Sequence, residues 1–503
     1  MRASLLRATT VVLLLYASTV ANAASLNAFG QDGLFEFDTV TVAIPSASAR
    51  EGGEIVVTHP TGVMDEPAPL VLFMFPIHGF PFSTWRTLMA NVIRALASNG
   101  FAVATPASID PNGNRPIQGG MFPGTTSTVS GIDLREMATR YLNFFTHASR
   151  YLVDLAQSDP SFALHGKLDT SRIGTMGFSV GGALSQYLAQ RLDAELPGRV
   201  VAEVALAPTI GTEVPFTGVD DIGAELFREF ASSMTVPTVF VAGENDGMGG
   251  LRDSAIYYDQ SRAPRVRVTA GNGATHCHAI VPMSECDLVQ GTRGLQSLDS
   301  IIAHAMMTLY LRPDTPRWRD ERELATEIIW RDGLEALHAQ MVTPLAPPNR
   351  AWEIRKVERD PELSLTMNAY SVAAPLAPQS VELIAVVRSS SRADECDEVQ
   401  VTVENVPVGI EATVTRLSPT EFGVDVRWTT VPQRARGAQT RQFLGNLLNA
   451  RSNRRPVQVS SEFGPRVGFA APSQSVLTIQ AKHACVRSGF AFADVFVNQP
   501  YAY

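Results

Sequence analysis

Between about residues 35 and 312, short apolar runs alternate with longer stretches of helical periodicity. Each apolar run is bounded by glycine, proline or aspartate, which is typical of strands buried on both faces. The predicted strands are residues 70–76, 102–106, 172–176, 201–207, 238–242 and 266–269. The predicted helices are residues 85–97, 134–156, 183–192 and 295–310. This alternation predicts a mostly parallel sheet with helices on both faces and functional loops at the carboxyl ends of its strands.

The pattern changes after residue 312. Residues 318–341 have a charged helical pattern, and a proline-rich break follows at Pro344, Pro347 and Pro348. From there to the end the residues alternate in the manner of strands, as in 380–387 and 400–406. We therefore predict an α/β domain over residues 24–345 and a β-rich, sandwich-like domain over residues 346–503.

The first 23 residues have the pattern of a cleaved signal peptide. Arg2 and Arg7 make a positively charged n-region before an apolar core at residues 10–16. Ala21-Asn22-Ala23 then forms a small-x-small cleavage site. This core is shorter than the roughly 20 residues that cross a bilayer, and no later segment is both long and apolar enough. We expect a mature protein that is secreted or periplasmic and has no transmembrane span.

The cysteines fit such a compartment, because disulfides persist outside the cytoplasm. Four cysteines allow three pairings, and closeness along the chain favours Cys277–Cys286 and Cys396–Cys485. A bond between Cys277 and Cys286 would pin the loop that contains them.

The charge balance argues against a nucleic-acid partner. The net charge is −9, whereas phosphate backbones are bound by dense basic surfaces. The richest group of arginines, in residues 434–455, lies among turn residues. A solvated loop explains this group, with binding to an anionic surface as the alternative.

Residues 177–181 read Gly-Phe-Ser-Val-Gly and match the pattern G-x-S-x-G around Ser179. The motif directly follows a predicted strand and precedes a predicted helix, which is the setting of a nucleophile elbow. In such a turn the serine lies at the end of the sheet, and backbone N–H groups at the helix start can bind a developing oxyanion. A glycine-rich turn without chemistry is the alternative.

A serine hydroxyl becomes a nucleophile when a histidine takes its proton and a carboxylate orients that histidine. In this setting the expected chain order is serine, acid, histidine. Asp246 follows the fifth predicted strand and His276 follows the sixth, so both occupy the expected places. Glu244 is the competing acid, and His278 is the competing base.

The two neighbouring histidines allow a second interpretation. His276 and His278 could bind a metal, but only Glu285 and Asp287 are nearby as further ligands, so neither a metal nor another cofactor is predicted. Two residues apart on an extended loop, the histidines would point in opposite directions, and only one could face Ser179.

A second oxyanion donor is expected in the loop after the first predicted strand, where residues 76–80 read Pro-Ile-His-Gly-Phe. The first donor is the residue after the nucleophile, Val180, and the loop supplies the second, Phe80. The backbone N–H groups of these two residues are therefore assigned to the oxyanion hole. The side chain of His78 is expected to brace the loop and not to carry a proton.

Together these segments resemble a known family. The run HGFPFSTWRTLMANVIRALASNGFAVATP, with KLDTSRIGTMGFSVGG, GENDG and GATH downstream, is similar to the dienelactone hydrolase-like branch of the α/β-hydrolase superfamily. Chlorophyllases, platelet-activating-factor acetylhydrolase-like enzymes and cutinase-type polyester hydrolases share this arrangement. The resemblance covers roughly residues 35–312 and implies an α/β-hydrolase fold with Ser179, Asp246 and His276 as the catalytic triad. Phe178 stands where many relatives have histidine and Val180 where chlorophyllases have arginine, so the resemblance does not assign a chlorophyllase.

Two long loops are candidates for the substrate pocket. Residues 108–131 are expected to overhang the site and residues 209–234 to wall its other side, although each could equally be packed filler. The predicted substrate-binding residues are Phe80, Met121, Phe122 and Phe178. Apolar walls would suit a hydrophobic ester, whether pigment, lipid or polyester.

Two other functions stay open at this point. The same triad would also cleave amides or peptides. A hydrolase-like domain can also be a catalytically inactive scaffold, in which case the C-terminal β domain would act by binding.

Overall fold

The computed structural model divides the chain into two compact units, residues 1–360 and 361–503. It describes residues 28–46, 52–62, 66–76, 81–110, 134–209, 234–244, 246, 250–271, 274–279, 292–334, 337, 352–358, 363–367, 371–373, 380–389, 399–404, 406, 409–428, 474–483 and 490–498. The predicted signal peptide, the proline-rich break and the arginine-rich segment lie outside these residues.

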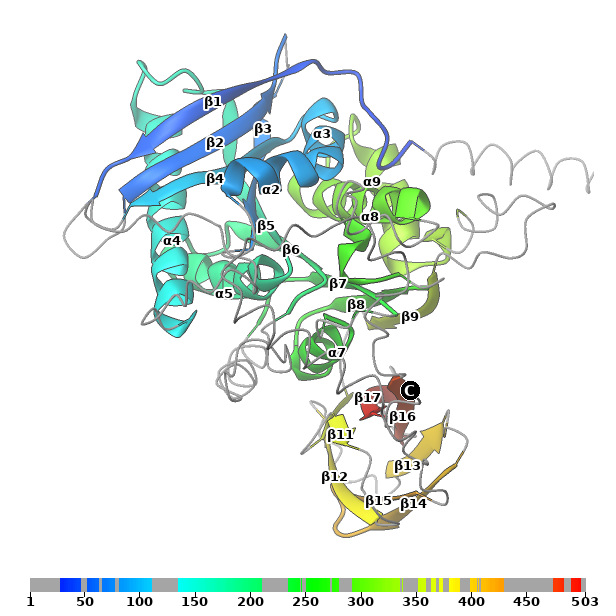
Figure 1. The fold of residues 1–503 in the computed structure, drawn as a ribbon. Coiled ribbons are helices and arrows are strands. Elements are labelled where there is room, and N and C mark those ends of the chain that lie inside the picture. The colour runs from blue at the N-terminus through cyan, green and yellow to red at the C-terminus, as the bar shows by residue number, and fades with distance from the viewer. Residues whose placement is uncertain are drawn as a thin grey trace, which may run out of the picture. The chain divides into compact units, whose positions relative to one another are not determined.

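The first unit is built on a nine-stranded sheet, whose strands lie in the order β1-β2-β4-β3-β5-β6-β7-β8-β9 (Figure 1). In this order, each strand from β4 to β8 pairs with the next in parallel. Strands β1, β2 and β9 are added at the two ends by antiparallel pairing. The bounds are β1 (Phe37–Ile44), β2 (Gly52–Pro60), β3 (Ala68–Met74), β4 (Ala102–Asp110), β5 (Leu168–Phe178), β6 (Val200–Leu206), β7 (Thr238–Gly243), β8 (Arg265–Ala270) and β9 (Trp352–Glu358). The predicted, mostly parallel α/β sheet is therefore confirmed, and its order is compatible with an α/β-hydrolase-like fold.

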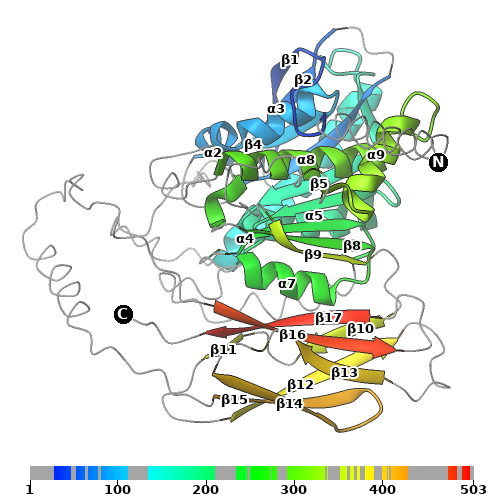
Figure 2. The same ribbon diagram turned by 90° about the vertical axis from the view of Figure 1, so that its right-hand side faces the viewer.

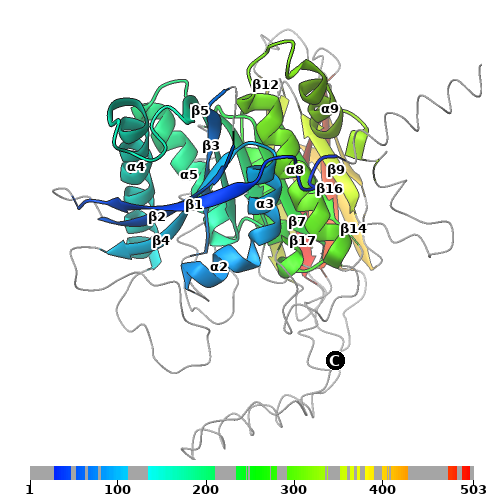
Figure 3. The same cartoon turned by 90° about the horizontal axis from the view of Figure 1, so that it is seen from above.

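Helices flank this sheet (Figure 3). They are α2 (Phe82–Leu88), α3 (Ala90–Ser98), α4 (Leu134–Ser158), α5 (Val180–Glu195), α7 (Gly250–Gln260), α8 (Thr292–Leu311) and α9 (Arg319–Trp330). Helix α3 packs against α8, and α4 packs against α5. The central strands are buried along most of their length because helices cover both faces, and every residue of β3 is buried. Among the described residues, no helix is both long and apolar enough to cross a membrane.

Several elements differ from the sequence predictions. The single helix predicted over residues 85–97 is two helices, α2 and α3, with a break at Met89. Helix α7 was not predicted, and the charged helix predicted over 318–341 is observed as α9, which ends at Trp330.

The predicted boundary at residue 345 is also too early. Residues 352–358 form β9, which pairs with β8 in the large sheet, so the first unit continues to Asp360. The alternating sequence of β9 resembles the strands that follow it, because an edge strand alternates polar and apolar residues as antiparallel strands do.

The second unit contains two four-stranded sheets (Figure 2), in the orders β10-β12-β15-β14 and β11-β17-β16-β13. Most of their strand pairs are antiparallel, and on β12 alternate residues are buried, namely Leu383, Ala385 and Val387. This period of two fits the predicted β-rich sandwich. The bounds are β10 (Leu363–Met367), β11 (Ser371–Ala373), β12 (Ser380–Ser389), β13 (Val399–Glu404), β14 (Ile410–Arg416), β15 (Glu421–Trp428), β16 (Gln474–His483) and β17 (Phe490–Asn498).

Candidate active site

Ser179 lies in a sharp turn between β5 and α5. Strand β5 ends at Phe178, α5 begins at Val180, and Ser179 has φ 57° and ψ −128°. A residue other than glycine is strained in this backbone conformation, and such strain is concentrated at functional sites. The turn is held by its backbone, because the N–H of Ser179 donates to the carbonyl of Leu206 (2.9 Å) and the N–H of Thr209 donates to the carbonyl of Ser179 (3.1 Å). The predicted strand–turn–helix geometry is thus present.

The glycines of the motif permit close backbone contacts. A Cβ atom on Gly177 would lie 2.1 Å from the carbonyl oxygen of Gly181, and a Cβ atom on Gly181 would lie 2.3 Å from that of Met74. The turn therefore packs directly on the neighbouring strand β3, and any side chain at these two positions would push the elements apart.

We expect the substitution Gly181→Ala to destabilise the protein by about 3 kcal/mol or more, since its Cβ would meet backbone atoms that cannot move away. Thermal unfolding measures the loss. The matched control is Gly198→Ala, where φ is +72° but no described atom lies within 4 Å of the added Cβ. Equal losses in the two variants would contradict the packing argument.

Three side chains from separate strand ends meet at this turn. His276 opens the short 3-10 turn η1 (His276–Ala279) after β8, and its Nε2 lies 2.8 Å from Oγ of Ser179. Its Nδ1 lies 3.0 and 2.9 Å from Oδ1 and Oδ2 of Asp246, which follows β7. The exposed fractions are 3% for Ser179, 8% for His276 and 4% for Asp246. A continuous chain of hydrogen-bonding groups thus runs from a buried carboxylate to the serine hydroxyl.

The structure distinguishes the two candidate acids. Asp246 contacts the imidazole of His276. Glu244 lies directly after β7, where its backbone N–H donates to the carbonyl of Ala270 at the end of β8 (2.8 Å). Gly250, the first residue of α7, comes so close to Asp246 that an added Cβ would lie 2.2 Å from Oδ2. The start of a helix carries partial positive charge, so α7 stabilises this carboxylate. This role of α7 was missed by the sequence analysis.

The Phe178 ring lies beside the imidazole. Its centroid is 5.2 Å from that of His276 and 5.8 Å from that of Trp85, and the side chain is only 1% exposed. Phe178, predicted to bind substrate, therefore borders the site through His276 and has almost no open surface of its own.

Val180 is the first residue of α5, so its backbone N–H has no acceptor within the helix. This placement is consistent with its predicted oxyanion role. The other predicted site residues fall outside the description: Phe80, His78, Met121, Phe122, the side chain of Cys277, and Cys286, Cys396 and Cys485. Their roles and the two disulfides remain predictions.

His278, the competing base, faces away from the serine. The two histidines share the 3-10 turn η1 and not the extended loop that was expected. His278 is fully buried, and its Nδ1 lies 3.0 Å from Oδ2 of Asp299 on α8. Among the described residues, no group of three or more His, Cys, Asp or Glu side chains is arranged to hold a metal ion.

Glu203 on β6 lies fully buried behind the elbow. The Ser185 hydroxyl on α5 donates to Oε1 of Glu203 (2.7 Å), and the Thr175 hydroxyl on β5 bonds to Oε2, so one carboxyl group joins the two elements that flank Ser179. Burial raises the pKa of Glu203 to about 8, although the hydrogen bonds from Ser185 and Thr175 act to lower it. The folded protein therefore keeps this group protonated at neutral pH.

This shift predicts that stability falls as the pH rises. The unfolded chain loses the Glu203 proton near its ordinary pKa of 4.5, whereas the folded chain keeps it up to about pH 8. The contribution of protonated Glu203 to the free energy of unfolding is complete below pH 4.5 and is lost as the pH rises through about 8. We expect the melting temperature of Glu203→Gln, relative to the unmodified protein, to rise between pH 5 and pH 9. A difference that does not change with pH would contradict this assignment, and Glu36→Gln, at an exposed glutamate, is measured beside it as the control.

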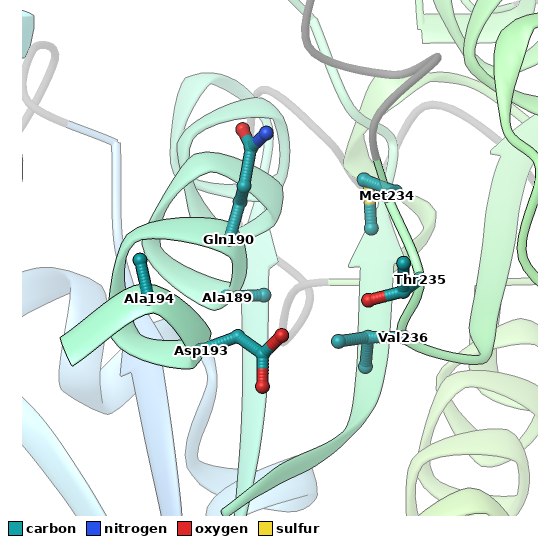
Figure 4. Close-up of a pocket in the computed structure, with 7 residues that line it drawn as sticks. All are labelled: Ala189, Gln190, Asp193, Ala194, Met234, Thr235 and Val236. Atoms are coloured by element: carbon teal, nitrogen blue, oxygen red, sulfur yellow. The ribbon is translucent and has the colours of Figure 1, made fainter. Parts of the chain in front are cut away.

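A separate cavity of about 230 Å³ lies between the last turns of α5 and residues 234–236, which lead into β7 (Figure 4). Its lining residues are Ala189, Gln190, Asp193, Ala194, Met234, Thr235 and Val236. At 1.5 Å per residue, these turns are roughly 15 to 22 Å along the helix axis from Ser179. The cavity is at the opposite end of α5, and we assign it no part in the chemistry of the triad.

Comparison with protein-family models and with curated proteins gives no match to this chain. The class of the protein must therefore be argued from the strand order and the geometry around Ser179.

Proposed function

We propose that the protein is a secreted serine hydrolase of the α/β-hydrolase superfamily that cleaves carboxylic esters. The observation that carries this proposal is the hydrogen-bonded series Asp246–His276–Ser179, with Nε2 of His276 2.8 Å from Oγ of Ser179. A strained serine, a histidine in hydrogen-bond contact with it and a buried carboxylate on the far nitrogen are the parts that activate a serine nucleophile.

The strand order supports the choice of superfamily. The three groups follow β5, β7 and β8, at the carboxyl ends of parallel strands, and their chain order is serine, acid, histidine. This order is the one that α/β-hydrolases use, whereas other serine hydrolases arrange the same groups in other orders. Within the superfamily, the segments that resemble the dienelactone hydrolase-like branch favour that branch.

The proposed reaction is acyl transfer in two steps. His276 takes the proton of Ser179, whose Oγ attacks the ester carbonyl, and the alcohol leaves with a proton from His276. Water then attacks the acyl-enzyme with His276 again as the base, and the acid is released. Asp246 holds the imidazole with its proton on Nδ1 and stabilises the charge that develops on the ring. These steps need no cofactor.

The tetrahedral intermediate needs donors for its oxyanion. The N–H of Val180, at the start of α5, supplies one donor in the proposal, and the N–H of Phe80 supplies the second. Removing a single donor of this kind commonly reduces kcat by about 10²- to 10³-fold.

The substrate is proposed as a hydrophobic ester, such as a pigment, lipid or polyester. This choice rests on the Phe178 ring, which packs against both Trp85 and His276, and on the apolar residues predicted in the loops around the site. Secretion rests on the signal-peptide pattern of residues 1–23.

The test uses the mature chain, residues 24–503, expressed in an oxidising compartment. The protein is treated with a fluorophosphonate probe, the labelled peptide is identified by mass spectrometry, and p-nitrophenyl esters of graded acyl length are assayed beside a p-nitroanilide. We expect a label on Ser179 and ester hydrolysis whose chain-length profile reports the acyl pocket. A folded protein that neither reacts with the probe nor hydrolyses any ester would overturn the proposal, and anilide cleavage alone would replace ester with amide.

A further inference from the structure

We propose that His278 and Asp299 form a second histidine–carboxylate pair that positions His276 for catalysis. This inference rests on the proposed function, because it assigns a task to the pair within that reaction. Neither residue touches Ser179 in the structure; both act through the turn η1.

The His278–Asp299 pair links helix α8 to the turn η1, which carries His276. His278 lies two residues after His276 in η1, and its Nδ1 is 3.0 Å from Oδ2 of Asp299. Both side chains are fully buried. Asp299 belongs to α8, which packs against η1 and against strands β5, β6 and β7. The pair therefore ties the turn that carries the base to a helix that is anchored on the sheet.

The turn needs such a support. It is only four residues long and follows β8 after a short loop, and its described backbone contacts include one bond from the N–H of His278 to the carbonyl of Thr275 (3.2 Å). His276 must nevertheless hold Nε2 within hydrogen-bond distance of Ser179. A displacement of about 1 Å at a catalytic group can cost roughly 100-fold in rate.

A merely structural residue would not need to be polar here. Nε2 of His278 and Oδ1 of Asp299 are buried without a hydrogen-bond partner in the described part of the chain. Burying polar atoms in this way is costly, and an apolar pair of similar size would avoid the cost. A directed hydrogen bond is the property that this polar pair has and that an apolar pair would lack.

The charges around His278 agree with this reading. Burial acts to lower the pKa of His278, but the charge of Asp299, the hydrogen bond to Asp299 and the charge of Asp246 together raise it above its ordinary value. A proton on His278 is thus favoured by two carboxylates, one on α8 and the other the acid of the triad. The pair is coupled electrostatically to the acid as well as mechanically to the base.

The experiment compares Asp299→Ala with Asp299→Asn in the mature chain. Asparagine keeps an oxygen that accepts the Nδ1–H bond of His278, whereas alanine removes it. Active sites are counted by complete fluorophosphonate labelling, so that kcat for a p-nitrophenyl ester is expressed per reactive serine. We expect Asp299→Ala to lower this kcat by roughly 10- to 100-fold with little change in KM, and Asp299→Asn to recover most of it.

His304→Phe is the matched control. His304 is also a buried histidine on α8, and burial lowers its pKa to about 3, with the Arg312 charge acting in the same direction. It packs near Phe29 and Phe101 and accepts the N–H of Gly30, and none of these contacts involves a residue of η1. We expect this variant to lose thermal stability while its kcat per reactive serine is unchanged.

The outcomes separate the hypotheses. If Asp299→Ala lowers only the melting temperature or the number of reactive sites, the pair is structural and the inference fails. If Asp299→Asn is as slow as Asp299→Ala, positioning by the hydrogen bond is refuted. Should Asp299→Ala not fold, the double variant His278→Phe/Asp299→Leu removes both buried polar groups together and is judged by the same kcat. Failure of the proposed function has another signature: the unmodified protein does not react with the probe.

Discussion

Replacing Ser179 with alanine is expected to lower kcat for an activated ester by roughly 10⁴- to 10⁶-fold. In the proposed mechanism the substitution removes the atom that attacks the carbonyl, and Nε2 of His276, the proton acceptor, is left with nothing to deprotonate except water. Some rate above the uncatalysed reaction should remain, since the oxyanion donors and the binding surface persist. Steady-state hydrolysis of a p-nitrophenyl ester measures the loss, and fluorophosphonate labelling should disappear with it.

The control for this variant is Ser149→Ala. Ser149 is also fully buried, but its hydroxyl donates to the carbonyl of Phe145 (2.6 Å) within α4. Its variant should keep the full rate and remain labelled. If Ser179→Ala melts like the unmodified protein and still hydrolyses the ester, the nucleophile has been assigned wrongly.

Replacing Asp246 with asparagine is expected to lower kcat by about 10⁴-fold, since an amide of the same shape stabilises the wrong tautomer of the histidine. Both carboxylate oxygens lie within 3.0 Å of Nδ1 of His276, so either can accept the Nδ1–H bond. In asparagine the amide NH₂ would instead present hydrogens to Nδ1. The proton would then move to Nε2, where it prevents His276 from accepting the proton of Ser179.

Glu244→Gln is the matched control, because Glu244 was the alternative acid and lies two residues earlier in the same loop. We expect its kcat to stay within a few-fold of the unmodified protein. A larger loss in Glu244→Gln than in Asp246→Asn, measured in the same ester assay, would exchange the two assignments.

The sequence was most informative where chemistry restricts the residue type. The elbow requires glycine at positions 177 and 181, since each packs backbone against backbone, and this requirement is written directly in the motif. The central strands were also predicted well because both of their faces are covered, so that most of them contain a short apolar run bounded by turn residues. Order along the chain then placed Asp246 and His276 at strand ends, where the structure brings them together with Ser179.

Other parts depend on tertiary contacts that leave no local signal. Helix α7 begins at Gly250, directly after a glycine-rich segment that favours a loop, and it is stabilised by packing on β7 and β8. His278 and Asp299 are 21 positions apart and belong to different elements, so their contact could not be inferred from spacing. The sequence analysis named His278 only as a rival of His276.

The position of β9 constrains how this chain could have been assembled from parts. The strand completes the sheet of the first unit, yet it comes after the proline-rich segment that looks like a linker. A genetic exchange at that segment would separate β8 from its neighbour and leave a row of unpaired backbone groups, which promotes association with other chains. An exchange that preserves the first unit would therefore have to fall beyond Glu358, close to Asp360, and not in the proline-rich segment.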